Sequence, residues 1–77
     1  MVSAYIFIQT EVGKARSVAQ ACAGIQGVLK ADAVTGPYDV VVLAQAESVD
    51  LLGQSVVARI QNVDGITRTL TSQIIRW

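Results

Sequence analysis

The sequence repeats itself at an offset of 38 residues, and no other feature limits the possible folds as strongly. Thr10 in the first half matches Ser48 in the second, and Gly27-Val28 matches Gly65-Ile66. Threonine and serine are favoured at helix starts because the hydroxyl accepts a hydrogen bond from the first turn, and glycine commonly follows a helix end. Each half is therefore expected to contain a strand, a helix and a second strand, within one domain that spans residues 1–77.

Hydrophobic periodicity gives the expected extent of each element. Alternating or continuous apolar residues predict strands, and apolar residues spaced by three or four predict helices. In the second half, Ser48 is expected to cap a helix in which Val49, Leu52, Val56 and Ile60 share one face, and Thr10 is expected to cap the first helix. The expected strands are 2–9, 28–34, 39–46 and 66 to about 75, and the expected helices are 14–23 and 49–62.

The order strand, helix, strand, strand, helix, strand is that of the ferredoxin-like α+β fold. In this fold the four strands form one antiparallel sheet, and two helices cover one of its faces. Lys30 and Asp32 make the second strand more polar, which is typical of a solvent-exposed strand at the edge of a sheet. We therefore predict a βαββαβ sandwich with one face of the sheet left uncovered.

The uncovered face is predicted to be apolar. Tyr5 and Phe7 alternate with Ala4 and Ile6 in the first strand, and Val41 and Leu43 alternate with their apolar neighbours in the third. A strand that is apolar on both sides is buried on both sides. The chain of 77 residues, 52% of them hydrophobic, leaves no segment to supply the second layer. We therefore expect a homodimer in which two sheets pack face to face.

The last strand carries a row of hydroxyl side chains. Assuming unbroken alternation, Ile66, Leu70 and Ile74 form the core face, which Arg68 and Ser72 interrupt. The opposite face carries Thr67, Thr69, Thr71 and Gln73. Threonine suits strands because it is β-branched, and a row of hydroxyls also suits the wall of a polar ligand site. Both interpretations remain open at this point.

The turn Gly36-Pro37-Tyr38-Asp39 precedes a buried strand and holds the densest polar chemistry of the chain. Asp39 is either an acceptor for the amides of the turn or a partner for a ligand ammonium group. Tyr38 is a packing aromatic in the first interpretation, while in the second Gly36 lets backbone amides approach a ligand carboxylate. The sequence alone does not choose between a structural turn and a ligand site.

Composition argues against several classes of function. Six basic and six acidic residues give a net charge of zero and are scattered singly, so no surface for nucleic acid or anionic membrane is expected. The chain has no histidine and no nucleophile beside a base, so we predict no catalytic residues, no metal site and no cofactor. Arg16, Arg59 and Arg68 are interpreted as solvated surface residues.

Cysteine usage and hydropathy indicate the compartment. The single Cys22 excludes an internal disulfide, and its place on the apolar helix face favours an inert core thiol. No apolar run approaches the roughly 20 residues that a membrane helix needs. We therefore expect a cytoplasmic protein. Trp77 is either a frayed end or an oligomer contact.

Two motifs resemble those of a known family. Gly36-Pro37-Tyr38-Asp39 is similar to the Gly-x-Tyr-Asp pattern of the effector domain of Lrp/AsnC (leucine-responsive/asparagine) transcription regulators. The segment from Gly65 to Thr71 is similar to that family's Gly-Val-x-x-Thr-x-Thr ending. The resemblance implies an αβ sandwich that dimerises through its sheets and assembles into tetramers, octamers or larger rings. It also implies a small effector, usually an amino acid, bound by Gly36, Tyr38, Asp39, Thr69 and Thr71.

The chain departs from the family pattern in one respect. Members usually carry an N-terminal helix-turn-helix domain, whereas here Met1 leads directly into the first strand. The expectation is therefore a stand-alone effector domain that does not bind DNA itself and that either senses an amino acid or co-assembles with a full-length regulator. Two other classes remain open: a dimeric ferredoxin-like-barrel enzyme of the small monooxygenase or isomerase type, and an ACT-type regulatory domain.

Overall fold

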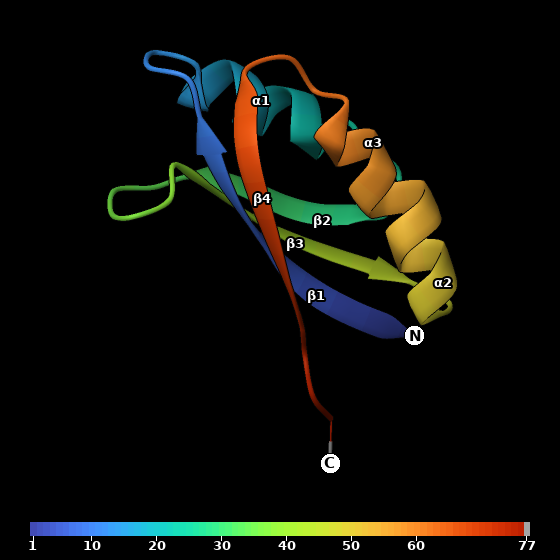
Figure 1. The fold of residues 1–77 in the computed structure, drawn as a ribbon. Coiled ribbons are helices and arrows are strands. Elements are labelled where there is room, and N and C mark those ends of the chain that lie inside the picture. Colours follow the sequence, from blue (N-terminus) through green and yellow to red (C-terminus); the bar gives the residue numbers. More distant parts are fainter. Residues whose placement is uncertain (77) are drawn as a thin grey trace.

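Strand β1 (Val2–Thr10) is the strand around which the sheet is built, because it pairs with a neighbour on each side. In the computed structural model, which describes residues 1–76, the strand order is β2-β3-β1-β4 and every neighbouring pair is antiparallel. The helices lie on one face of this sheet (Figure 1). The remaining elements are α1 (Ala15–Ala23), β2 (Val28–Ala33), β3 (Val40–Ala46), α2 (Val49–Leu51), a π-helical segment (Leu52–Val57), α3 (Ala58–Gln61) and β4 (Ile66–Gln73).

The predicted ferredoxin-like βαββαβ order is confirmed. β2 lies at an edge of the sheet, as the Lys30 and Asp32 pattern indicates. The core lies between the sheet and the helices, and β1 and β3 contribute their even-numbered side chains to it. Its buried apolar members are Ala4, Ile6, Ile8, Val18, Cys22, Val40, Val42, Ala44, Leu52, Val56 and Ile60. Among residues 1–76, no helix has the length and apolar character needed to cross a membrane.

The second helix runs without a break from Val49 to Gln61, and its middle is π-helical. Ser48 caps it as predicted, since its Oγ accepts a hydrogen bond from the backbone N–H of Leu51 at 3.1 Å. Leu52, Val56 and Ile60 are buried, but Val49 is 54% exposed. The prediction that Val49 shares the buried face is therefore wrong, because the first residue of the helix borders an open hollow beside β4.

Thr10 does not cap the first helix. It is the last residue of β1, and a turn separates it from α1, which begins after Lys14 without a side-chain cap. The turn is held by two backbone hydrogen bonds, from Glu11 N to Gly65 O at 2.8 Å and from Lys14 N to Glu11 O at 3.0 Å. The prediction was wrong because the repeat is less regular here: the first half has an extra turn between strand and helix.

The face assignment of β4 is reversed from Arg68 onward. Thr69 and Thr71 pair with Ile8 and Ile6, which are fully buried under the helices, whereas Leu70 pairs with Phe7 on the uncovered face and is 45% exposed. Residues directly opposite each other in an antiparallel pair share a face. The pairing shifts between Gln9 and Thr10, and an extra residue in one strand exchanges the two faces beyond it. Of the residues predicted to form the core face of β4, Ile66 packs against the core as expected, because it lies before the register shift.

The repeat itself is confirmed in the backbone. Gly27 and Gly65, which match in the alignment of the halves, have nearly equal φ angles of +97° and +96° and lie just before β2 and β4. At Gly27 the chain also passes very close to the second helix, because a Cβ there would lie 2.6 Å from Cγ2 of Val56. Gly27 is thus required both for its conformation and for packing.

Replacing Gly27 with alanine should lower the free energy of unfolding more than replacing Gly13 does. Both positions have positive φ, +97° and +82°, so either substitution imposes backbone strain of about 1–2 kcal/mol. Gly27→Ala adds an overpacking cost of about 1–3 kcal/mol against Val56, whereas nothing lies within 4 Å of a Cβ at Gly13. Urea unfolding of both variants at one protein concentration measures the difference. Equal losses would contradict the packing role of Gly27.

Candidate functional site

Asp39 fastens the loop between β2 and β3 to the end of β1. Its Oδ2 accepts a hydrogen bond from the backbone N–H of Thr10 at 2.8 Å. Its own N–H donates to the carbonyl of Ile8 at 2.8 Å, and its carbonyl accepts from Val34 N at 2.9 Å. The carboxylate of Asp39 therefore accepts from a backbone amide of β1 and not, as predicted, from the amides of its own turn. One carboxylate oxygen carries this bond, and Oδ1 accepts no hydrogen bond from residues 1–76.

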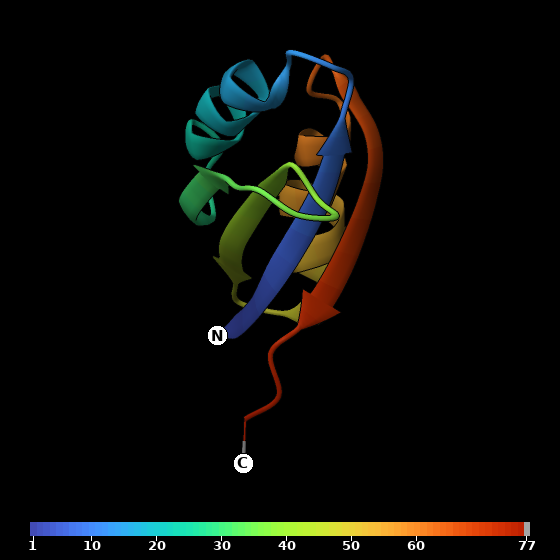
Figure 2. The same cartoon turned by 90° about the vertical axis from the view of Figure 1, so that its left-hand side faces the viewer.

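Gln9 links the same loop to β4. Its side-chain amide donates to the carbonyl of Pro37 at 3.1 Å, and its own carbonyl accepts from the hydroxyl of Thr67 at 3.1 Å. Figure 2 shows the loop passing in front of β1. Gln9 was not predicted as a site residue, although a polar residue at the end of an apolar strand was the available signal. Loop, β1 and β4 therefore meet at one end of the sheet.

Tyr38 packs on the uncovered face. Its ring centroid lies 5.4 Å from that of Phe7, and Phe7 in turn lies 6.4 Å from Tyr5, both in tilted arrangements. Gly36 is exposed near the apex of the loop at φ +133°, and nothing lies within 4 Å of the position of a Cβ there. The apex therefore needs glycine for its conformation and not for close packing, and its backbone is accessible to a ligand.

Thr69 and Thr71 lie on the other side of the sheet. The hydroxyl of Thr69 accepts a hydrogen bond from the side-chain amide of Gln61 at 3.3 Å. Thr71 borders an open hollow of about 340 Å³ between β4 and the second helix, together with Val49, Leu52, Gly53, Val57 and Gln73. Within one chain, the structure thus groups Gly36, Tyr38 and Asp39 but does not bring Thr69 and Thr71 to them.

The uncovered face carries an apolar surface that crosses three strands. We call it the open face: Tyr5, Phe7, Val41, Leu43 and Leu70. On the β2 side it ends at an ion pair between Lys30 and Asp32, whose Nζ and Oδ2 are 3.5 Å apart. A small hollow of about 190 Å³ lies between this pair and Tyr5, Val41 and Leu43. The predicted apolar character of this face is therefore observed.

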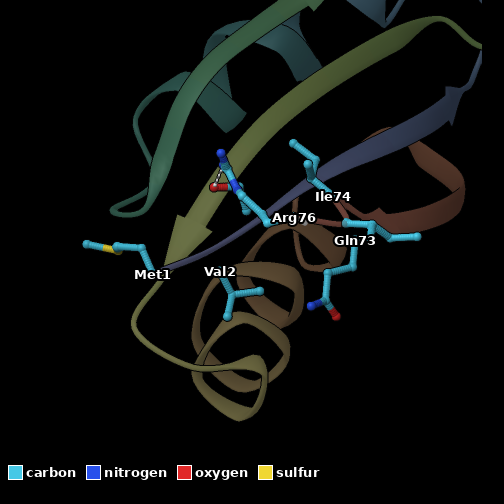
Figure 3. A pocket seen from close by; sticks show the side chains of 7 residues that line it. Met1, Val2, Gln73, Ile74 and Arg76 are labelled. Carbon is cyan, nitrogen blue, oxygen red and sulfur yellow. Dashed lines mark hydrogen bonds between the residues drawn. The ribbon is translucent and has the colours of Figure 1, made fainter.

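Another hollow lies away from these residues. It measures about 490 Å³ and is formed by the start of β1 and the segment after β4 (Figure 3). There the guanidinium of Arg76 donates to the hydroxyl of Ser3 at 3.2 Å, which satisfies this buried polar side chain. Asp39 and the loop lie at the opposite end of β1, so this hollow is separate from them. Trp77 lies outside the described residues.

The remaining reactive groups are structural or dispersed. Cys22 is buried, and desolvation raises the pKa of its thiol, so the thiol stays protonated and unreactive at neutral pH. Within residues 1–76, no three His, Cys, Asp or Glu side chains gather in a way that could hold a metal ion. The uncovered side carries the carboxylate of Asp39 beside the loop and that of Asp32 in its ion pair with Lys30.

Comparison with known proteins identifies relatives of the chain. The Lrp/AsnC ligand binding domain matches residues 3–76. The protein TTHA0845 from Thermus thermophilus superposes with a TM-score of 0.90 at 30% identity, covering 100% of this chain and 96% of that chain. The hypothetical protein PHS023 from Pyrococcus horikoshii gives 0.89 at 30% identity, covering 100% and 93%. No curated protein matches the chain significantly by sequence.

A third structure contains a ligand. The transcriptional regulator NMB0573 from Neisseria meningitidis, solved as a complex with L-Met, gives a TM-score of 0.82 at 19% identity. The match covers 97% of this chain and 50% of that chain, so the chain corresponds to about half of that regulator. At this identity the likeness establishes the shared fold.

Asp39→Ala should lower the free energy of unfolding by about 1–3 kcal/mol, because it leaves the N–H of Thr10 without its acceptor. Asp39→Asn keeps a carbonyl oxygen at that position and should cost less than about 1 kcal/mol. Urea unfolding measures both losses, and amide hydrogen exchange at Thr10 reports the local effect. If the two variants lose the same stability and Thr10 stays equally protected, the hydrogen bond does not anchor the loop.

Proposed function

Because the chain belongs to the Lrp/AsnC ligand-binding domain family, we propose that it binds an amino acid as a regulatory effector. The observation that carries this proposal is the match of the family to residues 3–76, which include both sequence motifs. A regulator of the same fold is solved in complex with L-Met, and this supports an amino acid as the ligand class.

The proposed effector site lies at the loop between β2 and β3. A ligand ammonium group would bind Oδ1 of Asp39, and the accessible backbone near Gly36 would face the ligand carboxylate. Tyr38 would close the site from the open face. Since Thr69 and Thr71 face the helices, they would join such a site only from another copy of the chain. The proposed site therefore depends on assembly.

Assembly is proposed to begin at the open face. Tyr5, Phe7, Val41, Leu43 and Leu70 form an apolar surface with no covering layer in the described chain. A second copy supplies a layer of the same composition, and face-to-face packing of two sheets buries about 1,200–2,000 Å² in interfaces of standard size. Dimers of this kind would associate further into tetramers, octamers or larger rings, with the effector between dimers.

The family favours a regulatory domain over the enzyme alternatives. Dimeric ferredoxin-like-barrel enzymes need acid, base or metal-binding groups on the sheet, whereas the open face is aliphatic and aromatic. We also propose that the domain acts in the cytoplasm and that a full-length Lrp/AsnC regulator is a second partner, joined through the same sheet or loop surfaces. A mixed oligomer would let effector binding to this chain change the state of that regulator.

Binding should appear as stabilisation by one or a few of the twenty amino acids. A ligand at 100 times its dissociation constant, bound only by the folded form, stabilises by about 2.7 kcal/mol. A thermal-shift screen with parallel light scattering detects both the stabilisation and any change in particle size. Asp39→Asn should weaken the response while leaving the fold intact, because the amide cannot hold an ammonium group as a carboxylate does. A flat screen on the well-folded protein would contradict the proposal.

Leu70→Arg should dissociate the sheet-to-sheet dimer. A charge buried in an apolar interface loses its hydration without gaining a partner. Val49→Arg is the matched control, because Val49 is 54% exposed on the helical layer, compared with 45% for Leu70. Sedimentation equilibrium at micromolar concentration measures the molar mass of each. A monomeric wild type, or equal masses for both variants, would refute this interface.

A further inference from the structure

A second hollow lies on the helical side of the molecule, remote from the loop of Asp39. It occupies about 360 Å³ between the segment that follows α1, the end of β3 and the second helix. This volume is within the range of small-molecule sites, about 300–1,000 Å³. Leu51 and Val56 give it an apolar wall, and the charged side chains on its lining are Glu47 and Arg59.

The floor of this hollow is fixed by close backbone packing. Gly27 belongs to the lining, and a Cβ there would lie 2.6 Å from Val56 Cγ2 and 3.1 Å from the carbonyl oxygen of Gln45. The carbonyl of Gly27 also accepts a hydrogen bond from Gln45 N at 2.8 Å. Val56 is 3% exposed. The hollow is therefore preformed at its base and does not need a rearrangement to accept a ligand.

The wall of the hollow includes the π-helical segment Leu52–Val57, which contributes Ser55 and Val56. A π turn takes up one more residue than an α turn, so residues after it are rotated by about 100° relative to an uninterrupted α-helix. Arg59 comes after the π-helical segment in the chain and is one of the residues that line the hollow. π-helical turns are rare and occur frequently at functional sites. The irregular geometry of the second helix thus coincides with the hollow.

The two charges of the hollow are unpaired within the described chain. Among residues 1–76, the only ion pair within 4.0 Å joins Lys30 and Asp32. The carboxylate of Glu47 and the guanidinium of Arg59 are therefore more than 4.0 Å apart, and neither forms a side-chain hydrogen bond with residues 1–76. An opposite pair of charges with space between them suits a molecule that carries both charges itself.

We propose that this hollow is a second ligand site, for a free amino acid bound as a zwitterion. Arg59 would hold the carboxylate with two parallel hydrogen bonds, and Glu47 would hold the ammonium group. The hydroxyl of Ser55 adds a further donor and acceptor, and Leu51 and Val56 would contact an apolar ligand side chain. This site differs from the proposed effector site in every residue, and it is complete within one chain.

Amide chemical shifts of the labelled full chain test both sites in one titration with the twenty amino acids. Ligand in the second site should shift the amides of Gly27 and Ser55, and ligand at the loop should shift those of Gly36 and Asp39. Shifts at Gly27 and Ser55 that survive Asp39→Asn support the second site, even where the loop does not respond. Shifts confined to the loop overturn it and leave the effector proposal standing. The absence of any shift overturns both.

The charges are tested by matched variants and matched ligands. Arg59→Gln and Glu47→Gln should each weaken binding at Gly27 and Ser55 at least about tenfold, as expected for the loss of a hydrogen bond to a charged group. Arg16→Gln and Glu11→Gln, at exposed positions outside the hollow, should leave the affinity measured at Gly27 and Ser55 unchanged. If L-leucine binds, N-acetyl-L-leucine and L-leucinamide, which each lack one charge, should bind at least about tenfold more weakly. Equal affinity of all three would exclude zwitterion recognition.

Discussion

The structure depends on a central strand that is apolar on both sides. Strand β1 lies between β3 and β4, and its even-numbered residues Ala4, Ile6 and Ile8 are fully buried under the helices. Its odd-numbered Tyr5 and Phe7 begin the open face. One strand therefore supplies both the core of the domain and the surface that a second copy is proposed to cover. Burial of the first face stabilises the fold, and the exposure of the second favours association.

The fold follows from local chemistry that the sequence displays directly. The glycine positions of the repeat, the cap at Ser48 and the edge pattern of β2 were all predictable, because each depends on residues close together in the chain. The shift between Gln9 and Thr10 was not, since a bulge depends on pairing with a distant strand and has no signature in alternation. Thr10 was misassigned for a related reason: its partner, Asp39, is remote in sequence.

The sequence names the residues of the candidate site but not their arrangement in space. The sequence singles out Tyr38, Asp39 and the row of hydroxyl side chains, but it does not show that Asp39 and Tyr38 contact β1. The side of the sheet that Thr69 and Thr71 occupy is decided by the bulge, and the part of Gln9 in joining loop and strand is decided by tertiary contact. The π-helical turn beside Arg59 was equally hidden, because its residues have ordinary helical spacing.

The strand order has a consequence for how the chain reaches this state. β1 and β2 belong to the first half of the repeat and β3 and β4 to the second, yet the order in the sheet is β2-β3-β1-β4. Every hydrogen-bonded ladder therefore joins one half to the other, and neither half contains a pair of neighbouring strands. β2 and β3 can pair as a local hairpin, but both ladders of β1 join segments far apart in the chain, so loop-closure entropy must be lost before they form. The two halves are interdependent, so folding is cooperative across the whole chain, and complementary halves from different copies can exchange.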